Sequence, residues 1–100
     1  MINHVVLFKL KEYNSLEEKE SVLDTFKSKL LSLKGVVPEL KYMEVGKHYI
    51  INSPSFDICL ITHFESVEDL KKYQVHPDHL KIVDFVQAVT VSRAAVDFEF

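Results

Sequence analysis

The chain has 100 residues, of which 47% are hydrophobic and 27% charged, with a net charge of -3 and one cysteine, Cys59. This length and apolar content predict one packed domain, while the acidic balance and the lack of Lys or Arg runs argue against a nucleic-acid partner. No apolar run is long enough for a membrane span, the N-terminus alternates like a strand rather than a signal peptide, and a lone cysteine suits a reducing compartment, so we expect a complete cytoplasmic protein.

The first half of the chain predicts a strand, a helix and a second strand. Residues 2–10 have apolar side chains at both even and odd positions, which point to opposite faces of a strand. This pattern predicts a strand that is covered on both faces. Ser15 and Glu18 form a capping box ahead of leucines at helical spacing, and Gly35 is expected to end that helix. A second strand is expected over residues 40–45, before Gly46 and a polar stretch.

The second half predicts a strand, two short helices and a last strand. Residues 56–64 are again apolar on both parities. Ser66 is a suitable cap for a helix that runs to about Tyr73, and Pro77 breaks the helical pattern and starts a second helix. The last strand is expected over residues 89–98.

The order βαββ(αα)β predicts an α+β, ferredoxin-like fold: a four-stranded antiparallel sheet with the helices on one face. The opposite face then has no helix to cover it, although it carries apolar side chains from two strands, Val5, Leu7, Cys59 and Ile61. Soluble monomers rarely expose so much apolar surface. We therefore expect a homodimer in which two sheets pack face to face as a dimeric α/β barrel.

Tyr73, His76 and His79 flank the predicted helix break. A helix N-terminus disfavours a protonated imidazole, so His79 in the first turn is biased toward the neutral form that a general base needs. Tyr73 is placed to donate its phenolic proton to a carbonyl oxygen, and His4 points into the same space if its face of the first strand meets the helices. The alternative is structural: His76 is then a helix-start residue and Tyr73 a buried ring with a bonded hydroxyl.

No metal and no cofactor are expected from the sequence. His76 and His79 are three residues apart, but the proline between them spoils a helical ligand pair, and no further ligand has motif spacing. Gly35 and Gly46 are the only glycines, so the chain has no glycine-rich phosphate loop.

Three segments, "INHVVLFKLK", "FESVEDLKKYQVHPDHLKIV" and "AAVDFEF", resemble the stress-responsive α/β-barrel (Dabb) family, which includes the plant cyclase that makes olivetolic acid. The resemblance covers residues 1–100 as a single domain and is most specific at Tyr73-x-x-His76-Pro77-x-His79. It implies a dimeric α+β barrel and catalytic roles for Tyr73 and His79 in an aldol-type ring closure. The substrate-binding residues that it implies are His4, Val6, Phe8, Phe26, Leu30, Leu60, Ile82 and Phe85, with Arg93 and Ala95 on the last strand where the cyclase has bulky aliphatic residues.

The sequence alone is compatible with three functions. The first is a cofactor-independent cyclase or lyase that acts on an apolar, carbonyl-containing small molecule, with His79 as base and Tyr73 as carbonyl partner. The second is a stress-associated protein that binds such a ligand without changing it, and the third is a structural dimer with no cavity. An open pocket around His4, Tyr73 and His79 would exclude the third function.

Overall fold

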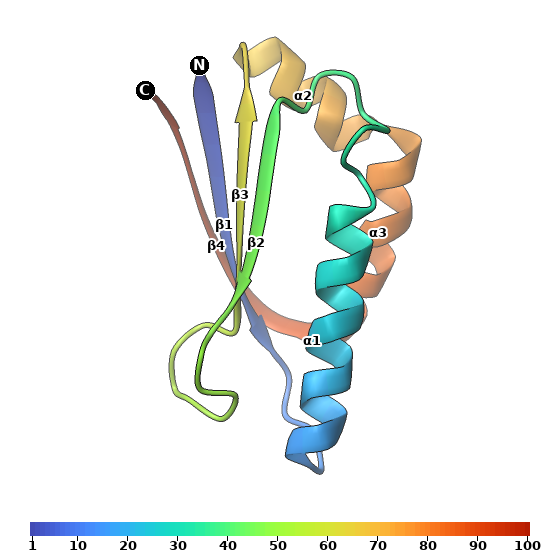
Figure 1. Cartoon of the computed structure of the whole chain (residues 1–100), viewed down its shortest axis with the longest axis vertical. Coiled ribbons are helices and arrows are strands. Elements are labelled where there is room, and N and C mark those ends of the chain that lie inside the picture. Colours follow the sequence, from blue (N-terminus) through green and yellow to red (C-terminus); the bar gives the residue numbers. More distant parts are fainter.

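The structure is a computed structural model that describes all 100 residues. Its elements are β1 (Ile2–Leu10), α1 (Leu16–Leu31), β2 (Tyr42–Lys47), β3 (Ile58–Phe64), α2 (Val67–Val75), α3 (Pro77–Val89) and β4 (Thr90–Glu99). The four strands form one antiparallel sheet in the order β2-β3-β1-β4. All three helices lie on one face of this sheet, and the other face is bare (Figure 1). The predicted ferredoxin-like α+β fold is confirmed.

The core lies between the helices and the sheet. Every second residue of β1 is buried, from Ile2 to Leu10, while the residues between them are only half-buried. The central strands meet in a register that places Val6 opposite Leu60, so both side chains face the helices. In α1 the buried residues recur at helical spacing, which turns one stripe of that helix toward the sheet.

Helix α1 begins where the sequence predicts and ends earlier. The Ser15 hydroxyl accepts a hydrogen bond from the Glu18 backbone N–H at 3.1 Å, as expected of a cap. The predicted end at Gly35 is wrong for the α-helix, which stops at Leu31. Leu33 and Lys34 follow in tight turns, because their backbone N–H groups donate to carbonyl oxygens three residues earlier. Gly35 then adopts a φ of 75°. The glycine therefore reverses the chain after these turns and does not cap the helix directly.

The break between α2 and α3 falls at His76, as predicted. This residue is extended (φ -60°, ψ 136°), as the following Pro77 favours. Its Nδ1 accepts a hydrogen bond from the Asp78 backbone N–H at 3.1 Å, so His76 is the cap of α3. The two helices therefore meet at an angle, with a corner between them (Figure 1).

Strand β4 is an edge strand whose two faces differ in chemistry. Its register with β1 turns Arg93, Ala95 and Asp97 toward the helices, and Val96 and Phe98 toward the bare face. β2 and β4 occupy residues 42–47 and 90–99, one or two residues later than predicted. No helix of the chain has both the length and the apolar character needed to cross a membrane.

Candidate functional site

A cavity of about 330 Å³ lies between the sheet and helix α3. This volume is at the lower end of the range for small-molecule pockets, about 300–1,000 Å³. Its apolar wall contains the expected residues Val6, Phe8, Leu30, Leu60 and Ile82, and its polar groups include the expected residues His4, His79 and Arg93. The sheet provides one wall and α3 the other. The alternate, helix-facing side chains of β1 and β3 lie opposite the apolar side of α3, and the cavity lies between them.

His79 lies in the first turn of α3 and presents a free nitrogen. Its Nδ1 is 3.0 Å from the carbonyl oxygen of Gln74, and because a carbonyl only accepts, Nδ1 carries the proton and Nε2 keeps its lone pair. Burial lowers the pKa of His79, and the charges of His4, Arg93 and His76 lower it further, against the bond to Gln74, which raises it. A neutral imidazole with one free lone pair is the form that a general base requires.

Tyr73 contacts His79 but does not line the cavity. The two ring centroids are 4.6 Å apart, and on another side the Tyr73 ring packs against Phe64 at 5.0 Å. The side chain is fully buried, and its hydroxyl has no hydrogen-bond partner within the chain. Burial raises the pKa of this hydroxyl above its ordinary value, so it is a donor and not a phenolate.

His4 is buried at the middle of the sheet and is held by Asp97 from the neighbouring strand. Its Nδ1 is hydrogen-bonded to the Asp97 carboxylate, which leaves Nε2 as its free nitrogen. The His4 carbonyl accepts a hydrogen bond from the Thr62 hydroxyl at 3.1 Å, tying the position to β3 as well. The contact with Asp97 orients the His4 ring, and the contact with Thr62 holds its backbone.

Phe26 and Phe85, two further residues expected at the pocket, are not among those that line it. Phe26 is fully buried and packs against Phe8 at 5.0 Å and against Phe85, edge-on, at 5.7 Å. The three rings form a packed layer between α1, α3 and β1. In this position Phe26 and Phe85 support the cavity wall from behind Phe8.

Four lining residues and one supporting residue were missed by the sequence reasoning. Gln74, Val83, Val86 and Gln87 line the cavity, and Asp97 holds His4. The parity of the last strand was a signal for Asp97, because it is two and four residues from Ala95 and Arg93 on the same face. The α3 residues were missed because a helix of unknown rotation offers no such parity.

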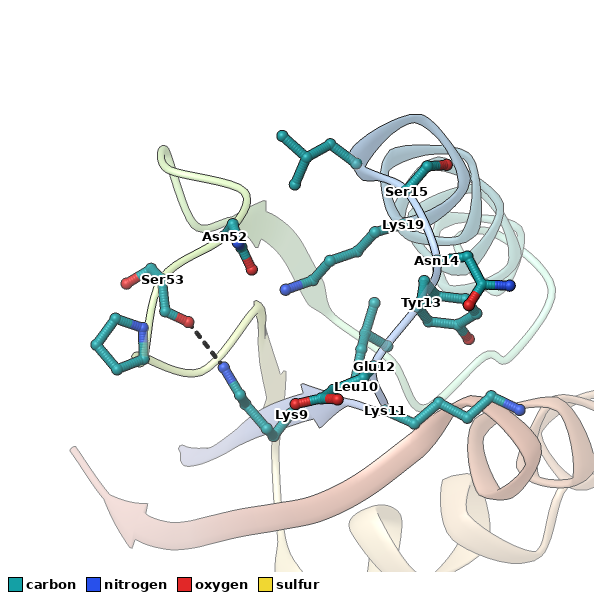
Figure 2. Close-up of a pocket in the computed structure, with 12 residues that line it drawn as sticks. Lys9, Leu10, Lys11, Glu12, Tyr13, Asn14, Ser15, Lys19, Asn52 and Ser53 are labelled. Atoms are coloured by element: carbon teal, nitrogen blue, oxygen red, sulfur yellow. Dashed lines mark hydrogen bonds between the residues drawn. The ribbon is translucent and has the colours of Figure 1, made fainter.

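A second hollow, of about 600 Å³, lies at the opposite end of the sheet between β1, α1 and the loop before β3 (Figure 2). It is polar, and two of its lysines, Lys9 and Lys19, form ion pairs with a buried carboxylate. The Asp57 carboxylate is 2.9 Å from Lys19 Nζ and 3.7 Å from Lys9 Nζ, and it accepts a hydrogen bond from the Leu10 backbone N–H at 2.8 Å. Lys9 also donates hydrogen bonds to the carbonyl oxygens of Ser53 and Ser55. This ion cluster ties the loop to α1 and β1.

No group of three or more histidine, cysteine, aspartate or glutamate side chains in the chain is placed to hold a metal ion. The polar groups of the site include one free imidazole nitrogen on His79, one on His4, and the guanidinium of Arg93, in an otherwise mostly apolar wall.

These features define a class of protein: a small ferredoxin-like α+β domain with a histidine-bearing cavity between its helices and its sheet. The family model for the stress responsive A/B barrel domain matches residues 2–100, and the chain belongs to this family. A curated relative, the stress-response A/B barrel domain-containing protein DABB1 of Arabidopsis thaliana, is 29% identical over an alignment of 101 positions, which includes 98% of this chain. The chain spans only 46% of that protein's length.

Solved structures share the fold along the whole chain. A dimeric protein of unknown function with a ferredoxin-like fold, from Bacteroides fragilis, is 32% identical, has a TM-score of 0.88, and is matched over 99% of this chain and 95% of its own. The hydroxynitrile lyase of Passiflora edulis is 17% identical with a TM-score of 0.79, over 97% of this chain and 90% of its own. At that identity the likeness to the lyase shows the fold alone.

Proposed function

We propose that the protein binds an apolar, carbonyl-containing small molecule in the cavity beside α3 and acts on it as a cofactor-independent cyclase or lyase, with His79 as general base. The observation that carries this proposal is the hydrogen bond from His79 Nδ1 to the Gln74 carbonyl, which leaves the Nε2 lone pair free in a mostly apolar cavity. The lowered pKa of His79 supports it, because the base is then neutral at physiological pH.

The proposed step is proton abstraction next to a carbonyl group. Nε2 of His79 takes the proton, the carbon–hydrogen electron pair moves into the new carbon–carbon double bond, and the carbonyl oxygen becomes an enolate. The enolate carbon then attacks a second carbonyl of the same molecule, which closes a ring; the π electrons of that carbonyl move to its oxygen, and the alkoxide takes the proton from His79. Where no second carbonyl is present, the enolate carbon takes a proton back from His79. The hydroxyl of Tyr73, which has no partner within the chain, is the proposed donor to the enolate oxygen.

A second candidate function is ligand binding without turnover. The observation that favours it is that Tyr73 is absent from the cavity wall, so its hydroxyl meets a ligand only after a side-chain movement. The lyase of Passiflora edulis shows only that a protein of this fold can be an enzyme, and a shared fold does not decide between the two functions.

Exchange of the α-hydrogens of butyrophenone in D₂O tests the proposed base. The ketone offers an apolar ring, a carbonyl and exchangeable hydrogens, and the exchange is followed by proton NMR without knowledge of the natural substrate. We expect the wild-type protein to accelerate the exchange and His79→Ala to reduce the acceleration by about 10²–10⁴-fold, the usual contribution of a general base.

His76→Ala is the matched control, because His76 caps α3 three residues away and is not part of the cavity wall. It is expected to keep the exchange rate and to lose about 1 kcal/mol of stability as a helix cap. Exchange that is unchanged in His79→Ala would rule out the base. Binding of butyrophenone with no exchange in the wild type would establish the second candidate function.

We further propose that the protein is a homodimer formed through the bare face of its sheet. The solved relatives from Bacteroides fragilis and Thermobifida fusca are described as dimeric. In this chain the bare face carries Val5, Leu7 and Ile61 on the central strands and Val96 and Phe98 on the edge strand. Val96 and Phe98 are 56% and 45% exposed in the single chain, and a partner sheet would remove them from water.

The proposed location is the cytoplasm. Cys59 is a free cysteine, and free cysteines without disulfides are typical of reducing compartments. The proposal is checked by fractionating the cells that produce the protein.

A further inference from the structure

The cavity beside α3 has two chemically different ends. His4 and His79 lie at one end, where β1 pairs with Asp97 of β4 and where α3 begins. The backbone of Arg93 lies opposite Phe8 at the other end, where α3 passes into β4 (Figure 1). Its positive charge still reaches His79, whose pKa it helps to lower. His4 and Phe8 are four residues apart on β1, which places their Cα atoms about 13 Å apart.

Helix α3 gives the same separation on the opposite wall. His79 and Gln87 both line the cavity and are eight residues apart, which corresponds to about 12 Å along a helix. Gln87 therefore lies toward the end of the cavity where α3 passes into β4, away from His79. Between the two ends the wall is apolar and includes Val6, Leu60 and Val83.

Arg93 is a cation without an internal partner. It is the only arginine of the chain, and it forms no ion pair and no side-chain hydrogen bond with another residue. The carboxylate on the same face of β4, Asp97, is bonded to His4 instead. With His79 neutral, Arg93 is therefore the uncompensated charge of the cavity.

The chemistry of this end selects one kind of group. A guanidinium presents its N–H donors as a planar fork that matches the two oxygens of a carboxylate, and the amide of Gln87 adds a further donor. Arg93 is exposed on an edge strand, so a carboxylate bound there stays in contact with water and avoids most of the cost of burying a charge.

We propose that the ligand of this cavity is a keto acid: a carbonyl group at the His79 end, an apolar spacer along the wall, and a carboxylate bound by Arg93 and Gln87. This inference rests on the proposed function, since it names the second functional group of the same small molecule. It makes Arg93 the residue that determines specificity and leaves the base chemistry to His79.

Matched acids and esters test the carboxylate separately from the cavity. The probes are ω-phenyl-ω-oxo alkanoic acids with two to five methylene groups, together with their methyl esters, and binding is measured by isothermal titration calorimetry. In the wild type the acid of the best-fitting length is expected to bind about tenfold more tightly than its ester, as for one charge-assisted contact at a solvent-facing site. Arg93→Gln is expected to abolish this preference while the ester binds as before.

Lys71→Gln is the control for net charge, because Lys71 is an exposed lysine on α2 without an ion pair. It should keep the preference for the acid. Arg93→Lys should keep only part of it, because an ammonium lacks the planar fork. If acid and ester bind the wild type equally, or if Lys71→Gln removes the preference as Arg93→Gln does, the carboxylate proposal is wrong and the proposed function stands. If no probe of the series binds, the proposed function fails with it.

Discussion

The hydroxyl of Tyr73 is held at a cost, because it is buried and has no partner within the chain. An unsatisfied buried polar group destabilises the native state by about 1–3 kcal/mol. Tyr73→Phe is therefore expected to raise the free energy of unfolding by about 1 kcal/mol or more, measured by urea denaturation at a fixed protein concentration. If Tyr73 is the donor to the enolate, the same variant loses the exchange of butyrophenone hydrogens.

Tyr42→Phe is the matched control for this measurement. The hydroxyl of Tyr42 donates to the Glu44 carboxylate at 2.6 Å on the exposed part of β2. Removing it should lower stability only slightly, because this hydrogen bond is exposed to solvent. A Tyr73→Phe variant that is less stable than the wild type would show that the hydroxyl has a partner in solution.

His79 makes stability depend on pH in a defined direction. Burial lowers its pKa in the folded state, whereas the unfolded chain has the ordinary value of about 6.5. The unfolded state therefore binds more protons just below pH 6.5, and stability is lost as the pH falls from there through the lowered pKa of the folded state.

The test is the urea midpoint of the wild type and of His79→Asn at pH 7.5 and 5.0. Asn keeps a donor for the Gln74 carbonyl and does not titrate. The wild type is expected to lose more stability between the two pH values than the variant. Equal losses, or an NMR titration that finds the imidazole protonated at neutral pH, would contradict the general-base role.

At the scale of elements, Asp57 is the last residue of the loop before β3. It joins this loop to β1 through the Leu10 N–H and Lys9, and to α1 through Lys19. Its side chain is 2% exposed and that of Lys19 is 11% exposed. Breaking a buried pair leaves an uncompensated charge, which typically costs about 3–5 kcal/mol. Asp57→Asn is expected to destabilise the fold by this amount in urea denaturation.

The control pair is Lys47 with Asp24, which also joins α1 to the sheet, at 2.6 Å, but with side chains that are 31% and 60% exposed. Exposed pairs contribute at most about 1 kcal/mol. Asp24→Asn should therefore have a much smaller effect than Asp57→Asn. Similar effects of the two substitutions would mean that Lys19 reaches solvent when Asp57 is neutral.

The elements differ in how well the sequence predicts them. Strand β1 and the break at Pro77 follow from local patterns, the parity of apolar residues and the chemistry of proline, so their positions were predicted. The same parity predicted β3, which begins at Ile58, two residues later than expected. The end of α1 was not, because consecutive turns after Leu31 carry the chain to Gly35 and no local signal separates a turn from a helix. The site is likewise divided into residues that local patterns or the family resemblance predict and residues whose positions depend on packing.

Parity put His4 on the same face of the first strand as Val6 and Phe8, and the family resemblance pointed to His4 and Arg93 as pocket residues. Which side of α3 faces the cavity, and the position of Tyr73 outside its wall, depend on helix rotation and packing that the sequence does not specify. The contact between His4 and Asp97 joins residues 93 positions apart, and such a pair follows only from the strand register.

At the scale of the whole molecule, the bare sheet face predicts the association state. Each apolar side chain moved out of water contributes about 1.5–3 kcal/mol, and the face carries Val5, Leu7, Ile61, Val96 and Phe98. We expect a dimer at micromolar concentration, measured by sedimentation equilibrium. Val96→Lys is expected to shift the protein to monomer, because it places a charge in the interface.

Val96 suits this test because it is 56% exposed in the single chain, so a lysine there costs the fold of one subunit little. Leu80→Lys is the matched control: Leu80 is 51% exposed, but it lies on α3, which packs on the other face of the sheet. The control should remain dimeric with an unchanged circular dichroism spectrum. A wild-type monomer would contradict the dimer. A Leu80→Lys variant that dissociates while Val96→Lys stays dimeric would move the interface from the sheet to the helices, and β4 would then need another explanation for its apolar outer face.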